Sequence, residues 1–589
     1  MIPPPRIPWQ ITGNHWVNVP CIHPADASIH SINVVHAGLK GAIDFAGSPD
    51  FIDGSGQPLM HITLAIDGKA QIVGGEGIAW ERESGWMPSF TSRLGDVMVR
   101  GAICAPFGKG IDVPGFIILV TCENRGSDAV DVELGLAGTI GHRQLRVRSA
   151  RSFQDTSRVD IGASENIVLE GTQAQSPVAV SIGCNGAAEV AVVDGASSRW
   201  SISDRATLGA RESVERAFLV AVGQERDGAE AVLNAMRRSG AAELVAVTRK
   251  ALREIEPATG NPSADRLIAR HVFVSCFCAV ARAIDDAHLY VMRSRIPWNG
   301  LGMTIRDWEA LMWVHPAVQL VDKNLARDLL VRICDLHGYA PGAGVHYIDG
   351  SMFEPGFSLE GAAAFPIAVD EYIVQSGDDK IVEEPLIADS LYNAFDDIAA
   401  HRSEQYPLYA TEVNPDGSLP EYAYTAHGNA AVALALDVLK HTLDEKTAEK
   451  VEDAATVRAA LLRHFGEGQT LVKATDLRGG KAGAAAPSMY WLPYFDLLPR
   501  EDSTYRRTVK PLEAATPSEV FARIARLIGP GGAAALEWLR RAPLDNGIAC
   551  ELVDQEGRAA GNGGDAALSG LLAFTAWYAV NALGIKPSG

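Results

Sequence analysis

The pattern of hydrophobic and polar residues divides the chain into a first part with a two-residue period and a second part with a helical period. In the first part, short apolar runs alternate with polar positions and end at turn-forming residues. Segments 62–66 and 70–73 flank Asp67-Gly68-Lys69, which predicts a hairpin. A strongly apolar run at 115–123 predicts a further strand. We therefore expect a first domain at 1–225 that is an antiparallel β-sandwich.

After residue 225, apolar residues recur at intervals of three and four, as they do on one face of a helix. Segments 229–238 and 241–255 predict a helical linker at 226–262, which ends in a stretch rich in Pro and Gly. The rest of the chain, 263–589, predicts a second domain made almost entirely of helices. The expected helices are 265–290, 307–320, 324–336, 361–376, 385–401, 425–441, 445–465, 517–527, 533–541 and 566–583.

The loops between these helices alternate in character. Short connections alternate with long loops that carry Gly, Trp, Tyr and acidic residues. The long loops are 291–306, 338–360, 407–424, 477–496 and 545–565. Long loops after every second helix predict a closed ring of helix pairs, with the functional residues on loops at one end of the ring.

Composition and charge exclude several classes of partner. The formal net charge is −20, from 72 acidic and 52 basic residues. Nucleic acids and anionic membranes need a basic surface, so we expect neither as a partner, whereas a neutral sugar is compatible. The eight cysteines include no CxxC motif, and we expect neither disulfides nor a metal site. The first ten residues lack the pattern of a signal peptide and no long uncharged apolar run occurs, so we expect a cytoplasmic protein.

The segment 294–314 concentrates residues that suit a sugar-binding site. Arg306 and Asp307 stand side by side where a loop meets a helix, and Trp308 follows them. A guanidinium and a carboxylate hold hydroxyl groups in fixed directions, and indole faces lie against the apolar face of a pyranose ring. Trp298 is a further candidate for stacking. The alternative is that Asp307 only stabilises the start of the helix.

Carboxylates in the long loops are the candidates for catalysis. Glu412 and Glu421 precede the helix expected at 425, and Glu551 lies in the Gly-rich loop before the last helix. Glycoside hydrolysis needs two carboxyl groups that flank one bond, and it needs no cofactor and no metal. The chain contains no GxSxG, HExxH or P-loop motif, so serine-nucleophile, zinc-protease and phosphate-cradle chemistries are not indicated.

The order of β domain, helical linker and helical ring resembles the bacterial glucoamylases of glycoside hydrolase family 15 and their relatives. In that family an Arg-Asp pair opens a barrel helix and grips the terminal sugar, and Arg306-Asp307 resembles this pair. The segment 359–363, which contains Glu360, is similar to the family's Asp-Gly-Pro-Ala stretch. The resemblance implies an N-terminal antiparallel β-sandwich (supersandwich) followed by an (α/α)6 barrel at 263–589.

The resemblance also implies a reaction. Leu419-Pro420-Glu421-Tyr422 resembles the acid motif of the family, so Glu421 would be the general acid, with Glu412 as its rival. The stretch around Glu551, with Asp565 ahead of the last helix, is similar to the base motif, so Glu551 would activate water. These features imply an exo-acting glycoside hydrolase that removes a terminal sugar with inversion, from an α-glucoside or a related small glycoside.

Three further residues are candidate contacts to the sugar. His427 would hydrogen-bond a hydroxyl group, and Tyr490 and Trp491 would stack on a ring. Two alternatives stay open: a disaccharide phosphorylase or α-L-rhamnosidase on the same architecture, and a lyase-like or non-catalytic toroid with a β-sandwich. In each of these cases the expected partner is a small-molecule carbohydrate.

Overall fold

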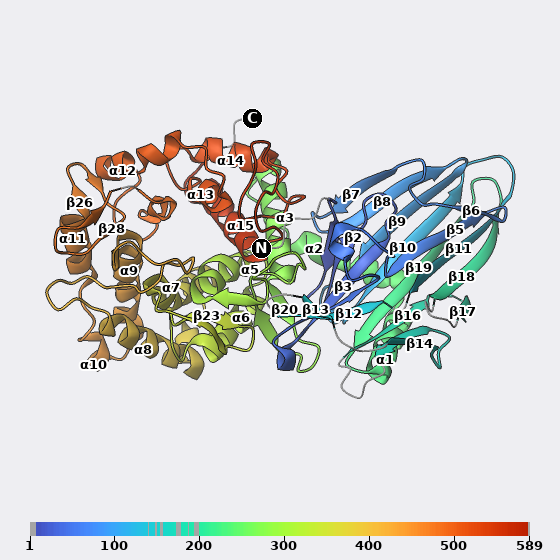
Figure 1. Cartoon of the computed structure of the whole chain (residues 1–589), viewed down its shortest axis with the longest axis horizontal. Coiled ribbons are helices and arrows are strands. Elements are labelled where there is room, and N and C mark those ends of the chain that lie inside the picture. Colours follow the sequence, from blue (N-terminus) through green and yellow to red (C-terminus); the bar gives the residue numbers. More distant parts are fainter. Residues whose placement is uncertain are drawn as a thin grey trace.

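The chain folds into a β-sandwich followed by a ring of helices, and the two lie side by side along the long axis of the molecule (Figure 1). This computed structural model describes residues 7–586 except 140, 148–149, 153–156, 172–177, 187, 194–198 and 484. Residues 1–6, on which part of the signal-peptide prediction rests, lie outside the described residues. The predicted fold class is confirmed. Among the described residues, no helix is long and apolar enough to cross a bilayer.

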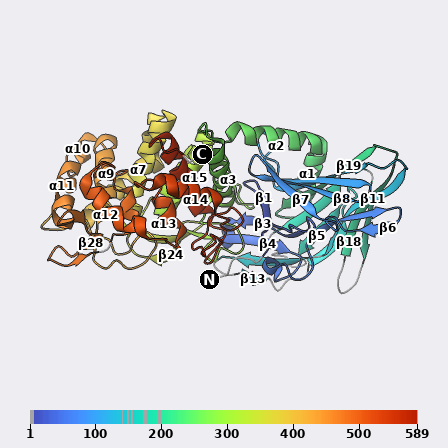
Figure 2. The ribbon, with the colours of Figure 1, turned by 90° about the horizontal axis from the view of Figure 1, so that it is seen from above.

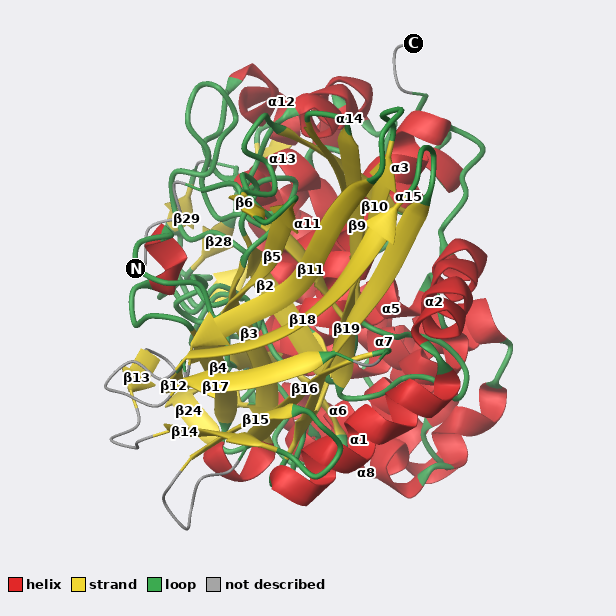
Figure 3. Cartoon of the chain, turned by 90° about the vertical axis from the view of Figure 1, so that its right-hand side faces the viewer, coloured by secondary structure: helices red, strands yellow, loops and turns green. Residues whose placement is uncertain are grey.

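Two antiparallel sheets pack face to face in the sandwich. The first has the order β13-β12-β4-β3-β5-β11-β18-β17, with β2 beside β3, β1 beside β2 and β6 beside β5; the second has the order β14-β15-β16-β19-β10-β9-β8-β7. The strands are β1 Gln10–Gly13, β2 Val17–Ile22, β3 Ile29–His36, β4 Gly41–Ala46, β5 Met60–Ile66, β6 Lys69–Gln71, β7 Ile78–Glu83, β8 Met87–Leu94, β9 Val97–Cys104, β10 Gly115–Asn124, β11 Val130–Thr139, β12 His142–Arg146, β13 Ala150–Ser152, β14 Ser157–Ile161, β15 Ile167–Gly171, β16 Ala179–Cys184, β17 Glu189–Val193, β18 Arg199–Leu208 and β19 Ser213–Gly223. Figure 3 shows the strands in front of the helices.

The hairpin predicted around residue 67 is present. β5 and β6 pair with Ile66 opposite Lys69, so two residues form the turn. Asp67 and Gly68 have φ angles of 50° and 73°, as a two-residue turn with both central residues left-handed requires. The sequence signal and the backbone geometry therefore agree here.

Two helices of the linker cover the second sheet. α1 (Arg226–Ser239) packs on β16 and β19, and α2 (Ala241–Ile255) packs on β10. Glycines in the sheet admit α1, because a Cβ at Gly115 would lie 2.9 Å from Met236 Sδ and one at Gly183 would lie 3.1 Å from Leu233 Cδ2. The domain limits at 225 and 262 stay predictions.

Within the described residues, the ring consists of six inner and six outer helical elements. The inner elements are α4 (Asp307–Glu309) with its continuations η3 (Ala310–Val314) and α5 (His315–Gln319), α7 (Leu359–Ser376), α9 (Ala426–Thr442), η5 (Pro487–Trp491), α13 (Val520–Ala525) and α15 (Ala566–Asn581). The outer helices are α3 (Pro262–Cys278), α6 (Lys323–His337), α8 (Pro385–Ala400), α11 (Ala454–Phe465), α12 (Ser503–Ala514) and α14 (Gly532–Arg541).

Contacts between successive inner elements close this ring. Each inner element touches the next one, and α15 returns to η3 and α5. α7, α9 and α15 are buried over most of their length, because they have the ring interior on one side and outer helices on the other. The architecture is therefore a closed barrel of helix pairs.

Several helix predictions were wrong in extent. The helix predicted at 265–290 ends at Cys278, and a hairpin of β20 (Val280–Arg282) and β21 (Leu289–Val291) follows, whose apolar residues extend the apolar run of α3. The segment 445–465 forms two helices, α10 (Glu445–Ala448) and α11. α12 and η5 were not predicted, because α12 contains Pro511 and η5 lies in a loop rich in Gly and Ala.

Short strands brace the long loops at one end of the ring. One three-stranded sheet contains β22 (Thr304–Arg306), β23 (Gly344–Tyr347) and β24 (Met352–Pro355). Another contains β25 (Tyr424–Thr425), β28 (Ala474–Thr475) and β29 (Lys481–Ala482), and β26 (Gly466–Glu467) pairs with β27 (Thr470–Leu471). β22 runs directly into α4 and β25 into α9, so these sheets fix the chain where inner helices begin.

A buried arginine joins the sandwich to the ring. Arg295 is fully buried, and its Nε donates to the carbonyl of Phe277 at 2.8 Å while its other nitrogens reach the carbonyls of Asn14 and His15. The carbonyl of Arg295 accepts from Arg146 Nη2 at 2.7 Å. One hydrophobic core continues from the sandwich into the ring, so the junction is a packed interface.

Candidate active site

A cavity of about 740 Å³ opens at the end of the ring where the inner helices begin. Every inner element contributes a side chain from its first turns to the lining. These side chains are Trp308 of α4, Glu360 of α7, His427 of α9, Met489 and Trp491 of η5, Phe521 of α13 and Leu568 of α15. The long loops that precede these elements supply the rest of the lining. No residue of the described part of the sandwich lines this cavity.

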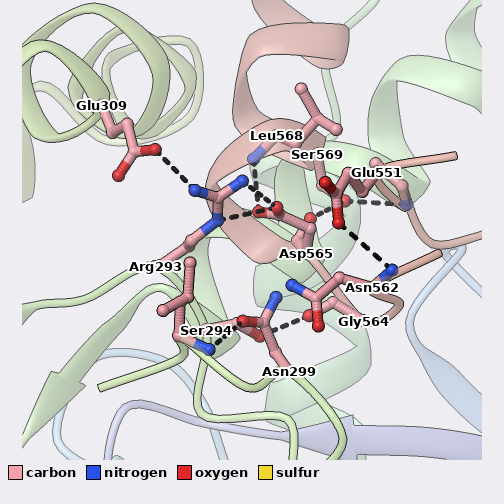
Figure 4. Close-up of polar contacts among 12 residues, drawn as sticks. Arg293, Ser294, Asn299, Glu309, Glu551, Asn562, Gly564, Asp565, Leu568 and Ser569 are labelled. Carbon is pink, nitrogen blue, oxygen red and sulfur yellow. Dashed lines mark hydrogen bonds and ion pairs between the residues drawn. The ribbon is translucent and has the colours of Figure 1, made fainter. Parts of the chain in front are cut away.

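Arg293 organises one wall of this cavity (Figure 4). Its Nη1 lies 2.7 Å from Glu309 Oε1, and its Nη2 lies 2.8 Å from Asp565 Oδ2. Both carboxylates are buried, and Asp565 also accepts a hydrogen bond from the backbone N of Leu568, which caps α15. Burial alone would lower the pKa of Arg293, but Asp565 and Glu309 raise it above its usual range. The guanidinium is thus a fixed positive charge between the starts of two inner elements.

Glu551 lies in the loop before α15, beside this network (Figure 4). Its backbone N donates to the carbonyl of Asn562 at 2.7 Å, and its Oε2 accepts from the backbone N of Asn562 at 3.4 Å. The side chain lines the cavity and is exposed, and its charge adds to the rise in the pKa of Arg293. Glu551 is therefore an accessible carboxylate, and its backbone and side chain are both hydrogen-bonded to the backbone of Asn562.

Glu421 lines the same cavity from the loop before α9. Its Oε2 lies 3.2 Å from Lys473 Nζ, and its side chain is 54% exposed. Glu412, its rival in the sequence, does not line the cavity; its Oε2 accepts from the backbone N of Phe357 at 2.9 Å. The structure therefore brings Glu421 and Glu551 to one cavity and places Glu412 outside it.

Glu360 and His427 meet at the starts of α7 and α9. Glu360 is 1% exposed, and its Oε1 lies 3.2 Å from His427 Nδ1, while its Oε2 has no hydrogen-bond partner among the described residues. Gly428 permits this approach, because a Cβ there would lie 3.0 Å from Glu360 Oε1. The His427 ring lies edge-on to Trp308, with ring centroids 5.4 Å apart. These three side chains form a continuous polar and aromatic wall.

Asp307 does not line this cavity, although the sequence predicts it as a sugar contact. It is 1% exposed, its Oδ1 lies 2.9 Å from His337 Nδ1, and its Oδ2 accepts from the backbone N of Gly342 at 2.8 Å. Burial would raise the pKa of Asp307, but His346 and His337 hold it below its usual range. Asp307 is committed to the interior of the ring and holds the loop 338–360 against α4.

Trp298 and Tyr490, predicted to stack on a sugar, are also outside the cavity lining. Trp298 is buried and its Nε1 donates to Asp545 Oδ2 at 2.7 Å, so it supports the loop that carries Glu551. Tyr490 is 1% exposed and packs against Gly529, where a Cβ would lie only 2.5 Å from the Tyr490 ring. Both aromatic rings therefore pack in the core, away from the lining of this cavity. Arg306, Trp308 and Trp491 do line the cavity.

The described part of the chain contains one group of potential metal ligands, which consists of Asp307, His337 and His346. Each offers one ligand atom, and these three atoms lie within 4.8 Å of one another. The two imidazole rings stack, with centroids 4.2 Å apart and an interplanar angle of 16°. Both rings approach the same oxygen of Asp307, whereas a metal would spread its ligands around itself. The group therefore fits a hydrogen-bonded support better than a metal site.

Several cavity residues were not predicted from the sequence. They are Arg293, Glu309, Asp416, Lys473, Phe495, Glu519, Phe521 and Asn562. Part of this set could have been predicted from the sequence, because the first turns of alternate helices in the ring line the cavity. Lys473 gives no such signal, since it precedes the two-residue strand β28 in a segment without a clear period.

Comparisons with known proteins agree with this architecture. No family model matches the chain, and no curated protein matches it in sequence. A bacterial glucoamylase complexed with acarbose is similar in structure, with a TM-score of 0.61, 12% identity, and coverage of 99% of this chain and 94% of that one. A putative kojibiose phosphorylase from the human microbiome has a TM-score of 0.59, 11% identity, and coverage of 97% of this chain and 86% of that one.

At these identities the likeness shows the fold. The chain shares the fold of these two structures, a β-sandwich joined to an (α/α)6 barrel. A glucoamylase and a putative phosphorylase share this fold, so the likeness does not single out glycoside hydrolase family 15.

Proposed function

We propose that this protein is an exo-acting glycoside hydrolase that removes a terminal sugar with inversion, with Glu421 as general acid and Glu551 as general base. One observation carries the proposal. Glu421 and Glu551 are 130 positions apart in the chain. Glu421 lies in the loop before α9 and Glu551 in the loop after α14, yet both line one cavity at the mouth of the ring. Two carboxyl groups that face one sugar-sized cavity are the minimal equipment for glycoside hydrolysis.

The cavity also offers what a terminal sugar needs for binding. Trp308 and Trp491 contribute indole rings to its lining, and Arg306, Glu360 and His427 contribute hydrogen-bonding groups. Side chains from all six inner elements surround the cavity, and such an enclosure suits the end of a sugar chain. An α-glucoside or a related small glycoside is the proposed substrate.

In the proposed reaction, Glu421 gives a proton to the leaving oxygen while Glu551 takes a proton from the attacking water. The bond from the anomeric carbon to the leaving oxygen breaks as the bond to the water oxygen forms on the opposite face. The Arg293 network keeps the loop of Glu551 in place through Asp565, so Glu551 can meet water in a fixed direction.

Replacement of Glu551 by Gln tests this proposal. The assay follows the anomeric proton of the released sugar by NMR, across α- and β-aryl glycosides of common hexoses. We expect the native protein to release the inverted anomer and E551Q to lose about 100-fold or more of kcat. E412Q is the matched control, because Glu412 lies outside the cavity, and it should keep its activity. Undiminished turnover by E551Q would remove this residue from the mechanism.

The disaccharide phosphorylase is the second candidate, since one of the similar folds is that of a putative kojibiose phosphorylase. In a phosphorylase, phosphate attacks the anomeric carbon in place of water. The same NMR assay, run with and without inorganic phosphate, separates the two reactions. Turnover that requires phosphate and yields a sugar phosphate would replace the hydrolase proposal by this one.

A further inference from the structure

A second hollow, of about 660 Å³, lies where the sandwich, the linker and the ring meet. It is lined by the turn after β7, the end of α2, the first half of α3 and the end of α14, which gather at the domain junction (Figures 1 and 2). Its lining contains six arginines and one acid: Arg82, Arg253, Arg266, Arg270, Arg540, Arg541 and Glu256. We call it the arginine pocket. Such a concentration of positive charge is unexpected in a chain of net charge −20.

Arg270 is the central residue of this pocket. It is only 7% exposed, and its Nε and Nη2 have no hydrogen-bond partner among the described residues. Its Nη1 makes one long contact, 3.4 Å, with the carbonyl of Gly85, and its guanidinium lies 5.7 Å from the ring of Trp86. Burial lowers the pKa of Arg270, and the charge of Arg82 lowers it further. A buried guanidinium without a counterion is unfavourable, so an anion at this place would stabilise it.

The neighbouring arginines leave most of this charge uncompensated. Arg82 donates to the neutral amide of Gln10 at 3.0 Å. Arg253 and Arg266 are exposed, and neither forms an ion pair with an acid in the described part of the chain. Arg540 and Arg541 share Glu537, so among the described residues only these two arginines of the pocket have an acidic partner.

The pocket keeps open space next to Arg270. Gly547 stands across from it, and even a Cβ there would lie 3.9 Å from Arg270 Nε. Gly547 belongs to the loop that continues to Glu551, yet none of the residues that line the arginine pocket lines the candidate active site. The two cavities are therefore distinct sites.

We propose that the arginine pocket binds a small molecule that carries a phosphate group, with Arg270 as its inner ligand and Arg82, Arg253 and Arg266 around it. Guanidinium groups hold phosphate through paired hydrogen bonds, and the low exposure of Arg270 strengthens them. A volume of about 660 Å³ exceeds the need of a bare phosphate ion and suits a sugar phosphate or a mononucleotide.

Isothermal titration calorimetry on the full chain tests the proposal with three probes: inorganic phosphate, glucose 6-phosphate and AMP. The variant is R253Q/R266Q, which removes two exposed charges and leaves the core intact. The matched control is R238Q/R507Q, which removes two exposed arginines outside the pocket and gives the same net charge. We expect one molecule to bind per chain, about tenfold or more weaker in the variant and unchanged in the control.

The probes also identify the ligand. Tighter binding of glucose 6-phosphate or AMP assigns the pocket to a phosphorylated metabolite, and equal binding of inorganic phosphate assigns it to the free ion. R270Q, checked for folding by circular dichroism, should lose the rise in Tm that the bound probe gives the native protein. The proposal is overturned if no probe binds at concentrations on the order of 10 mM, or if R253Q/R266Q binds as tightly as the control.

Discussion

Arg293 is the residue on which the wall beside Glu551 depends. It holds the buried carboxylates of Glu309 and Asp565 through contacts of 2.7 and 2.8 Å. Removal of the guanidinium leaves Asp565 buried without a counterion and leaves Glu309 with only the longer contact of 3.8 Å to Arg306 Nη1, so we expect R293M to lose roughly 3 kcal/mol of the free energy of unfolding. Chemical denaturation measures this loss. Addition of E309Q to R293M should recover part of it, and a further loss in that double variant would contradict the ion-pair account.

Glu371, on the inner helix α7, makes stability depend on pH. Burial raises the pKa of Glu371 to about 8, with a smaller contribution from Asp370, and its Oε2 has no partner among the described residues. The folded chain therefore keeps a proton that the unfolded chain releases above a pKa of 4.5. The stability that folding gains from the protonated Glu371 is fully present below a pH of 4.5 and is lost as the pH rises through about 8.

E371Q tests this linkage through thermal unfolding at several pH values. Gln cannot lose a proton, so we expect E371Q to gain about 1–3 kcal/mol relative to the native protein between about pH 5 and pH 8. E384Q is a suitable control, because Glu384 lies near the surface in an ion pair with Arg327. A parallel pH profile of E371Q and the native protein would be at odds with the raised pKa.

Sequence reasoning reached some of these residues and missed others for physical reasons. Glu421 and Glu551 were predicted from a local resemblance to family motifs, and their roles stay predictions, although both side chains line one cavity. Trp298 and Tyr490 were predicted to stack on a sugar but pack in the core, and an aromatic side chain in a Gly-rich loop has the same local sequence in either setting. Arg293 was missed, because its partners lie 16 and 272 positions away and no local pattern joins them.

At the scale of elements, the loop that carries Glu421 is positioned by a glycine. Gly417 has a φ of 83°, and a Cβ there would lie 2.3 Å from Arg306 Nη2. G417A therefore has to move either the loop or the guanidinium. We expect kcat/KM to fall about 10- to 100-fold with a small change in Tm, because displacements near 1 Å suffice for such losses.

G468A is the matched control for this variant. Gly468 also has a positive φ, 61°, but a Cβ there would meet no atom within 4 Å. The control thus has the same backbone strain without the contact to Arg306. Equal activity of G417A and G468A would show that the approach of Gly417 to Arg306 is unimportant.

Periodicity located most elements of the ring but not all of them. α7, α9 and α15 are long runs of mostly apolar residues, and their predicted ranges overlap the observed ones closely. The hairpin of β20 and β21 was taken for the end of a helix, because strands that are buried on both faces are as apolar as a buried helix. η5 is a single short turn and carries no period of its own.

At the scale of the whole molecule, the sandwich and the ring should unfold together. Their cores are continuous, and Arg295 ties three carbonyls of the junction. Scanning calorimetry of the native protein should therefore give one transition. R295M removes the charged donor that the carbonyls of Phe277, Asn14 and His15 share, and should split the profile into two transitions. Two separate transitions in the native protein would contradict a single cooperative unit.

The most direct test of the central claim compares leaving groups in hydrolysis by the E421Q and E551Q variants. A glycosyl fluoride leaves without help from an acid, whereas an alkyl glycoside needs a proton from one. We predict that E421Q hydrolyses the fluoride at nearly the native rate and loses the alkyl glycoside, while E551Q loses both. Equal loss of both substrates in E421Q, or retention of fluoride hydrolysis in E551Q, would contradict the assignment of Glu421 and Glu551 as the acid and base of one cavity.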